Sequence, residues 1–109
     1  MLVVESNYSN AHGTPWVYRY KKMGSIVGMP VPGTMTSVNW ETMQDPTLYF
    51  GIPIIGYLTK EGYYLENTQL EPDILIDNDP NSVVNGEDKQ LEAAVKELLR
   101  QIDEDKDNW

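Results

Sequence analysis

Apolar and polar residues follow one another along the chain in short segments that predict an α/β fold. Short strands are predicted where apolar, β-branched or aromatic residues cluster between turn signals, at 2–5, 25–28, 34–41, 63–65 and 74–76. The stretch 48–58 is also apolar, but Gly51, Pro53 and Gly56 interrupt it. Since proline is tolerated at edges and bulges, this stretch predicts two short strands with irregular backbone between them.

The first predicted helix follows the opening strand. Thr14 and Pro15 indicate its start, because threonine caps helices and proline suits the first helical position. An alternative start at Ser9 or Asn10 would place Pro15 inside the first turns. Gly24 is the predicted end of this helix.

The second predicted helix lies near the end of the chain and carries the clearest periodicity. Asp88 is its predicted cap, and a short helical turn is expected before it within 77–88. An apolar stripe at helical spacing is formed by Leu91, Val95, Leu98, Leu99 and Ile102. Mixed short strands with two main helices leave sheet edges exposed, and such edges favour pairing with another chain, for example as a homodimer.

Composition narrows the classes of function. The net charge of -9 comes from 17 acidic and 8 basic residues, and an acidic surface repels nucleic acid. The segment 103–109 predicts a solvated acidic tail. No apolar run reaches the roughly twenty residues of a membrane span. Without cysteine there is no thiol nucleophile, and with His12 as the one histidine no metal site of several His and Cys ligands can form within one chain.

Four motifs carry the interpretation further, in a fixed order: ESNYSNAH at 5–12, GSIVGMPVPGT at 24–34, YLENTQLEPD at 64–73 and GEDKQLEAA at 86–94. Together they resemble the end of the catalytic domain in the tail-specific protease family (S41 peptidases), in its tricorn-type branch. The resemblance implies that 1–109 is a C-terminal fragment of a serine-peptidase catalytic domain. It also implies a partial ClpP/crotonase-like core, with the N-terminal part of the domain upstream.

The resemblance assigns roles to three residues. Ser9 corresponds to the nucleophile, and the backbone N–H of Asn10 to a donor of the oxyanion hole, where the family more often has aspartate. Glu66 corresponds to the acid of a Ser-His-Ser-Glu tetrad, whose histidine and other serine lie upstream and outside this chain. The chain is therefore expected to be inactive alone, with a peptide or protein as substrate and no cofactor. From the residues alone, Ser9 could also be a helix cap and Glu66 a surface acid.

Four further residues are candidates for a substrate cleft: His12, Pro32, Gly33 and Thr34. The loop 29–35 either lines such a cleft or forms a rigid turn. Thr34 stands where family members with a Ser-Lys dyad carry the lysine, which favours the Ser-His-Ser-Glu branch. His12 as the catalytic base would need an unusual loop geometry; otherwise it lines the cleft or satisfies a loop carbonyl.

Two readings outside catalysis stay open at this point. The chain could be a non-catalytic interaction fragment that completes another chain's sheet, or a pseudo-protease that binds peptides without cleaving them. The replacement of the family's more frequent aspartate by Asn10, together with the single histidine, keeps the second reading open. The sequence leaves the compartment undetermined.

Overall fold

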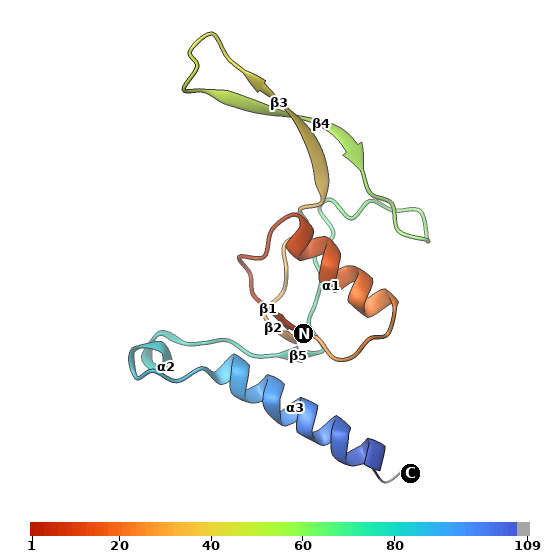
Figure 1. The fold of residues 1–109 in the computed structure, drawn as a ribbon, viewed down its shortest axis with the longest axis vertical. Helices are drawn as coiled ribbons and strands as arrows, with labels where there is room; N and C mark the ends of the chain where they lie inside the picture. The colour runs from red at the N-terminus through yellow and green to blue at the C-terminus, as the bar shows by residue number, and fades with distance from the viewer. Residues whose placement is uncertain (107–109) are drawn as a thin grey trace.

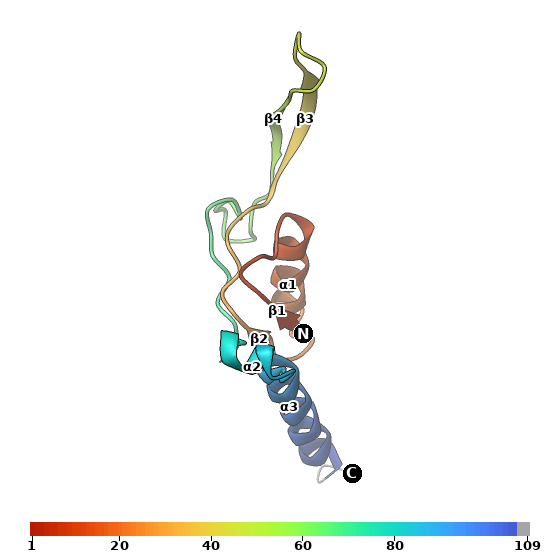
Figure 2. The ribbon, with the colours of Figure 1, turned by 90° about the vertical axis from the view of Figure 1, so that its left-hand side faces the viewer.

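The computed structural model describes residues 1–106 as a mixed α/β fold of short strands and a few helices, as predicted (Figure 1). The elements in chain order are β1 (Leu2–Val3), α1 (Asn10–Tyr20), β2 (Val27–Gly28), β3 (Thr36–Thr42), β4 (Tyr49–Gly56), β5 (Ile74–Leu75), α2 (Pro80–Val84) and α3 (Lys89–Lys106). The shape is elongated and thin, with extents of 62 × 40 × 18 Å. Figure 2 shows the thin profile, with β3 and β4 far from the rest. Of the acidic tail, 103–106 continue α3, and 107–109 lie outside the described residues.

A parallel sheet in the order β1-β2-β5 lies between α1 and α3. Leu2 pairs with Val27 and Val3 with Gly28, so β2 is the central strand and β1 has a neighbour on one side. Gly28 is required here, because its φ is 133° and a Cβ would lie 1.8 Å from the carbonyl oxygen of Val3. The two strands therefore approach closely at this one residue.

A small apolar core lies between this sheet and α1. It consists of four buried side chains, with Trp16 and Tyr18 of α1 packed against them: Val3, Ile26, Val31 and Leu70. Val31 and Leu70 also exchange two backbone hydrogen bonds of 2.9 Å each, which join the loop after β2 to the segment before β5. The core is thus formed by residues from distant parts of the chain.

The start of α1 differs from the main prediction. The helix begins at Asn10, so the predicted start at Thr14 is wrong and the alternative start is confirmed. The N–H groups of His12 and Gly13 donate to the carbonyl of Ser9, which closes the first turn before Thr14 is reached. The helix ends at Tyr20, ahead of Gly24, and Lys22 with φ 52° takes the left-handed conformation after it.

The strands β3 and β4 form an antiparallel hairpin that projects from the body (Figures 1 and 2). The prediction of two short strands over 48–58 is wrong, because β4 runs unbroken over eight residues. Its pairing shifts between Ser37 and Val38, whose partners are Ile55 and Pro53, so Ile54 is an extra residue at a bulge. A two-stranded sheet has two open edges, which accommodates Pro53.

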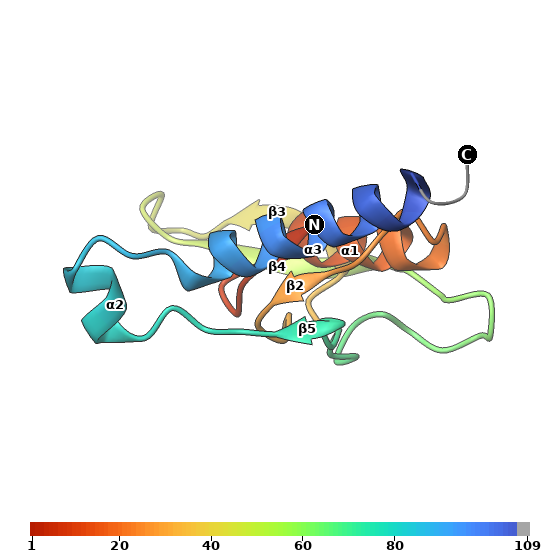
Figure 3. The same cartoon turned by 90° about the horizontal axis from the view of Figure 1, so that it is seen from below.

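The last helix, α3, lies against β1 and β2 (Figure 3). Asp88 caps it as predicted, since its carboxylate accepts the Leu91 N–H at 2.9 Å. The helix contacts the body through a polar face that includes Gln90, Glu97 and Gln101. The five side chains of the predicted apolar stripe are all 45–56% exposed, although Leu98 also lines a small cavity against the body. Within residues 1–106, no helix is both long and apolar enough to cross a membrane.

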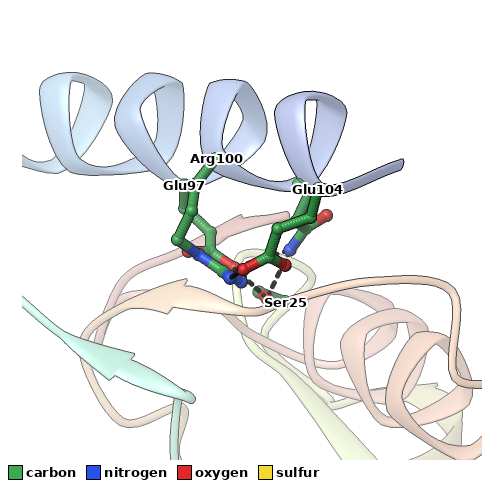
Figure 4. A network of polar contacts seen from close by, with 5 residues as sticks. Ser25, Glu97, Arg100 and Glu104 are labelled. Carbon is green, nitrogen blue, oxygen red and sulfur yellow. Dashed lines mark hydrogen bonds and ion pairs between the residues drawn. The ribbon is translucent and has the colours of Figure 1, made fainter. Parts of the chain in front are cut away.

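One polar network attaches α3 to the start of β2 (Figure 4). The hydroxyl of Ser25 donates to Glu97 at 2.8 Å and accepts from the amide of Gln101 at 2.8 Å. Arg100 forms two hydrogen bonds of 2.8 Å with Glu97 from the next turn. Arg100, Gln101 and Ser25 together hold the pKa of Glu97 down at about 2. The attachment therefore depends on an ionised carboxylate.

Candidate active site

Ser9 lies at the turn between β1 and α1, in a conformation that non-glycine residues rarely adopt. Its φ and ψ are 53° and −115°. Asn7 holds the turn together, since its side chain accepts the Val4 N–H at 2.8 Å and donates to the Ala11 carbonyl at 3.0 Å. A backbone conformation like that of Ser9 costs about 1–3 kcal/mol, and outliers of this kind cluster at functional sites. The hydroxyl of Ser9 has no hydrogen-bond partner in the described part of the chain and is available for reaction.

A free backbone donor lies directly beside Ser9. The N–H groups of Ala11, His12 and Gly13 are already bound, to the carbonyls of Tyr8 and Ser9. The N–H of Ser9 itself donates to Oγ1 of Thr34 at 3.2 Å. Across residues 1–106, the N–H of Asn10 donates to no acceptor. A free N–H at a helix N-terminus can stabilise an oxyanion.

Glu66 is held in one orientation by the start of β3. Its Oε2 accepts the Met35 N–H and the Thr36 hydroxyl, each at 2.7 Å. No donor in the described residues contacts Oε1. The carboxylate is half-buried, so it retains one fixed oxygen and one that can accept a further hydrogen bond.

An open cavity of about 410 Å³ brings these residues together. It is lined by residues from four separate stretches of the chain, namely Tyr8, Ser9, Thr34, Thr36, Val38, Pro53 and Glu66. Ser9, Glu66 and Thr34 thus share one cavity, although they are distant in sequence. Pro32 and Gly33 do not line it, and Asn10 lies beside it at the helix start.

His12 does not line this cavity. Its side chain is fully buried, and neither ring nitrogen has a hydrogen-bond partner within residues 1–106. Burial lowers the pKa of the His12 imidazole, while the Thr68 backbone and the charge of Glu66 oppose this shift more weakly. The ring is therefore neutral at physiological pH, and the structure does not place it in the cavity with Ser9.

A second cavity, of about 590 Å³, is lined in part by the first residues of α1. Asn10, Gly13 and Trp16 contribute from the helix, and Met35 and Tyr57 from either side of the hairpin. A Cβ on Gly13 would lie 2.8 Å from the sulfur of Met35, so glycine allows this packing. The walls are mostly apolar and suit an apolar group. Sequence reasoning missed this cavity; the helical spacing of Gly13, Trp16 and Val17 was the available signal.

The model of the family described as Peptidase family S41 matches residues 1–76. The chain belongs to peptidase family S41. The resemblance predicted from the four motifs is therefore confirmed. The match includes the segments of both Ser9 and Glu66.

Relatives of this S41 chain place it in the tricorn-type branch. A tricorn-like protease C-terminal subunit of Sulfurisphaera tokodaii is 25% identical over 107 residues, which is 95% of this chain and 12% of the relative. The tricorn protease homolog of Saccharolobus solfataricus is 22% identical, covering 94% of this chain and 10% of the relative. The S41 chain thus spans about a tenth of the length of the curated relatives it matches.

Two solved structures share the fold. The crystal structure of the tricorn protease superposes with a TM-score of 0.79 at 17% identity, over 92% of this chain and 10% of that one. The crystal structure of mature CPAF gives a TM-score of 0.64 at 23% identity, over 75% of this chain and 16% of that one. These likenesses confirm the predicted fold class.

Proposed function

We propose that residues 1–109 form the C-terminal part of the catalytic domain of a serine-type endopeptidase. The observation that carries this proposal is the shared cavity of Ser9 and Glu66, next to the free N–H of Asn10. A nucleophile, an orienting acid and an oxyanion donor are three parts that acyl transfer by a serine requires. Family membership supports the same roles for these residues.

In the proposed reaction, Oγ of Ser9 attacks the carbonyl carbon of the scissile peptide bond while a base takes its proton. The N–H of Asn10 donates to the oxyanion of the tetrahedral intermediate. The base returns the proton to the leaving amine as the C–N bond breaks, and water then hydrolyses the acyl-enzyme ester. Glu66 orients the base through a hydroxyl, as the resemblance implies. The proposal takes the base from outside this chain, because His12 is fully buried and does not line the Ser9 cavity.

Two open surfaces support the proposal that the rest of the domain packs against this chain. The apolar stripe of α3 is exposed, and β1 has a free edge beside it. Exposed apolar stripes and open sheet edges are typical of surfaces that another part of the protein covers. The chain alone is therefore expected to be inactive, lacking both its base and these contacts.

The test is fluorophosphonate labelling of the natural protein that carries this sequence, with the intact mass and the labelled residue determined. Labelling at Ser9, abolished by Ser9→Ala, supports the proposed function. Peptide binding by an unlabelled protein would instead indicate a pseudo-protease. An unlabelled protein of this chain's size that pairs with itself or another chain would indicate a non-catalytic interaction fragment.

A further inference from the structure

The three consecutive residues 34–36 form hydrogen bonds with both candidate catalytic residues, at the backbone of Ser9 and at the side chain of Glu66. Oγ1 of Thr34 accepts the N–H of Ser9 at 3.2 Å. The Met35 N–H and the Thr36 hydroxyl both donate to Oε2 of Glu66 at 2.7 Å. We propose that Thr34 and Thr36 are positioning residues, which set the placement of Ser9 relative to Glu66. This inference rests on the proposed function and assigns to that site two residues with no direct part in the chemistry.

Thr34 acts on the backbone of Ser9. The N–H of Ser9 precedes the helix, so no helical carbonyl can accept it, while the carbonyl of the same peptide plane, that of Tyr8, accepts the Ala11 N–H at 2.9 Å. Thr34 supplies the acceptor for the Ser9 N–H and so holds the second side of this plane. Because Ser9 holds φ at 53°, a change in this plane redirects both its hydroxyl and the neighbouring N–H of Asn10.

Thr36 acts on the carboxylate of Glu66. Two donors on one oxygen prevent rotation of the carboxylate and leave Oε1 available. The backbone next to it is also fixed, since the Asn67 N–H donates to the Gly33 carbonyl at 2.7 Å. A Cβ on Gly33 would lie 2.2 Å from the Thr68 nitrogen, so this contact between 33–36 and 66–68 requires glycine. The stretch from Gly33 to Thr36 therefore holds Glu66 at a set distance from Ser9.

The experiment uses the natural protein with Thr34→Val and Thr36→Val, which remove the hydroxyl and keep the shape. Thr34→Ser and Thr36→Ser restore a hydroxyl, and Thr42→Val at the far end of β3 is the matched control. Misplacement of reacting groups predicts a fall in kcat/KM of about 10- to 100-fold for each valine variant, with KM changed by less than about twofold. The serine variants should recover most of the loss.

Two further measurements separate positioning from general damage. In a Glu66→Gln background, Thr36→Val should lower kcat/KM little further, because Thr36 acts through Glu66. Amide hydrogen exchange at Ser9, resolved by mass spectrometry with electron-transfer fragmentation, should accelerate by about tenfold or more in Thr34→Val but not in Thr42→Val.

The proposal is overturned if the valine variants behave like Thr42→Val, or if the serine variants lose as much as the valine ones. If the loss of kcat/KM in the double variant equals the product of the losses in Thr36→Val and Glu66→Gln, the proposal is also overturned for Thr36. If the unaltered protein is not labelled at Ser9, the proposed function fails instead, and amide exchange still decides whether Thr34 holds Ser9.

Discussion

Two regions of the chain differ in how many of their contacts the chain itself supplies. One is the site around Ser9 and Glu66, and the other is the outlying surface of the hairpin and of α3. Around the site, Asn7, Thr34 and Thr36 supply hydrogen bonds that fix the backbone and the carboxylate. On the hairpin and on the outer face of α3, large apolar side chains remain in solvent, among them Trp40 at 62% and Leu99 at 56% exposure. The chain therefore fixes the geometry around Ser9 and Glu66 by itself, whereas it leaves apolar side chains on these other surfaces uncovered.

The apolar core is small because many large apolar side chains lie on these outlying surfaces. A two-stranded hairpin is marginal by itself in water, and the three-stranded sheet has edge strands at β1 and β5. Much of the apolar surface of this chain is therefore suited to burial by contacts that the chain does not make with itself.

The largest effect is expected from removing the nucleophile. In the natural protein, Ser9→Ala should lower kcat for peptide hydrolysis by about 10⁶-fold, because the acyl-enzyme can no longer form. Thermal unfolding should hardly change, since the Ser9 hydroxyl has no partner in the part of the chain that the structure describes. Ser6→Ala, in the same turn and exposed, is the control and should retain activity. Equal activity of both variants would remove Ser9 from the mechanism.

The next effect concerns the sheet beneath the site. Gly28→Ala should destabilise the natural protein by about 4 kcal/mol or more, because its Cβ would overlap the Val3 carbonyl. Gly86→Ala is the matched control: its φ of 77° is also positive, but no atom lies within 4 Å of its added Cβ. It should cost only about 1–2 kcal/mol. Denaturant unfolding measures both, and a similar cost for the two variants would contradict the close approach of β1 and β2.

A smaller effect tests whether the outer face of α3 is covered. If another part of the domain packs there, Leu99→Ser should destabilise the natural protein by about 2–4 kcal/mol. Lys96→Ser, an exposed position on the same helix, should change stability by less than about 0.5 kcal/mol. Equally small values for both, measured by denaturant unfolding, would show that the stripe faces solvent in the whole protein.

The smallest effect concerns the attachment of α3 through Ser25. Because folding lowers the pKa of Glu97, its contribution to stability is present above its ordinary pKa of 4.5 and is lost as pH falls toward about 2. Glu97→Gln should therefore flatten the fall of stability over this acidic range. Glu92→Gln, on the same helix, should leave the fall unchanged. Unfolding followed across that range compares the two, and identical profiles would contradict the role of the carboxylate.

Much of the fold followed from the sequence, and the misses have physical causes. The periodicity of 91–102 predicted α3 and its stripe correctly. It could not show that the helix would contact the body through Gln90, Glu97 and Gln101, because periodicity identifies the apolar side of a helix and not the polar hydrogen bonds that attach it. Thr14–Pro15 is a good local start signal, but the turn held by Asn7 begins the helix earlier.

The candidate site was predictable in part. The motifs identified Ser9 and Glu66 through a resemblance, and the structure places both in one cavity. No periodicity indicates that Thr34 accepts the Ser9 N–H or that Thr36 donates to Glu66. These contacts depend on the path of the chain after β2, where Gly33 lies against the backbone of Asn67 and Thr68.

The root of the hairpin has a mechanical consequence. The projecting arm starts at Thr36, the same residue whose hydroxyl holds the Glu66 carboxylate (Figure 1). The hairpin is therefore joined to the rest of the chain in the wall of the Ser9 cavity. A partner that bound the tip and tilted the hairpin would displace Thr36, and with it the hydroxyl that donates to Glu66.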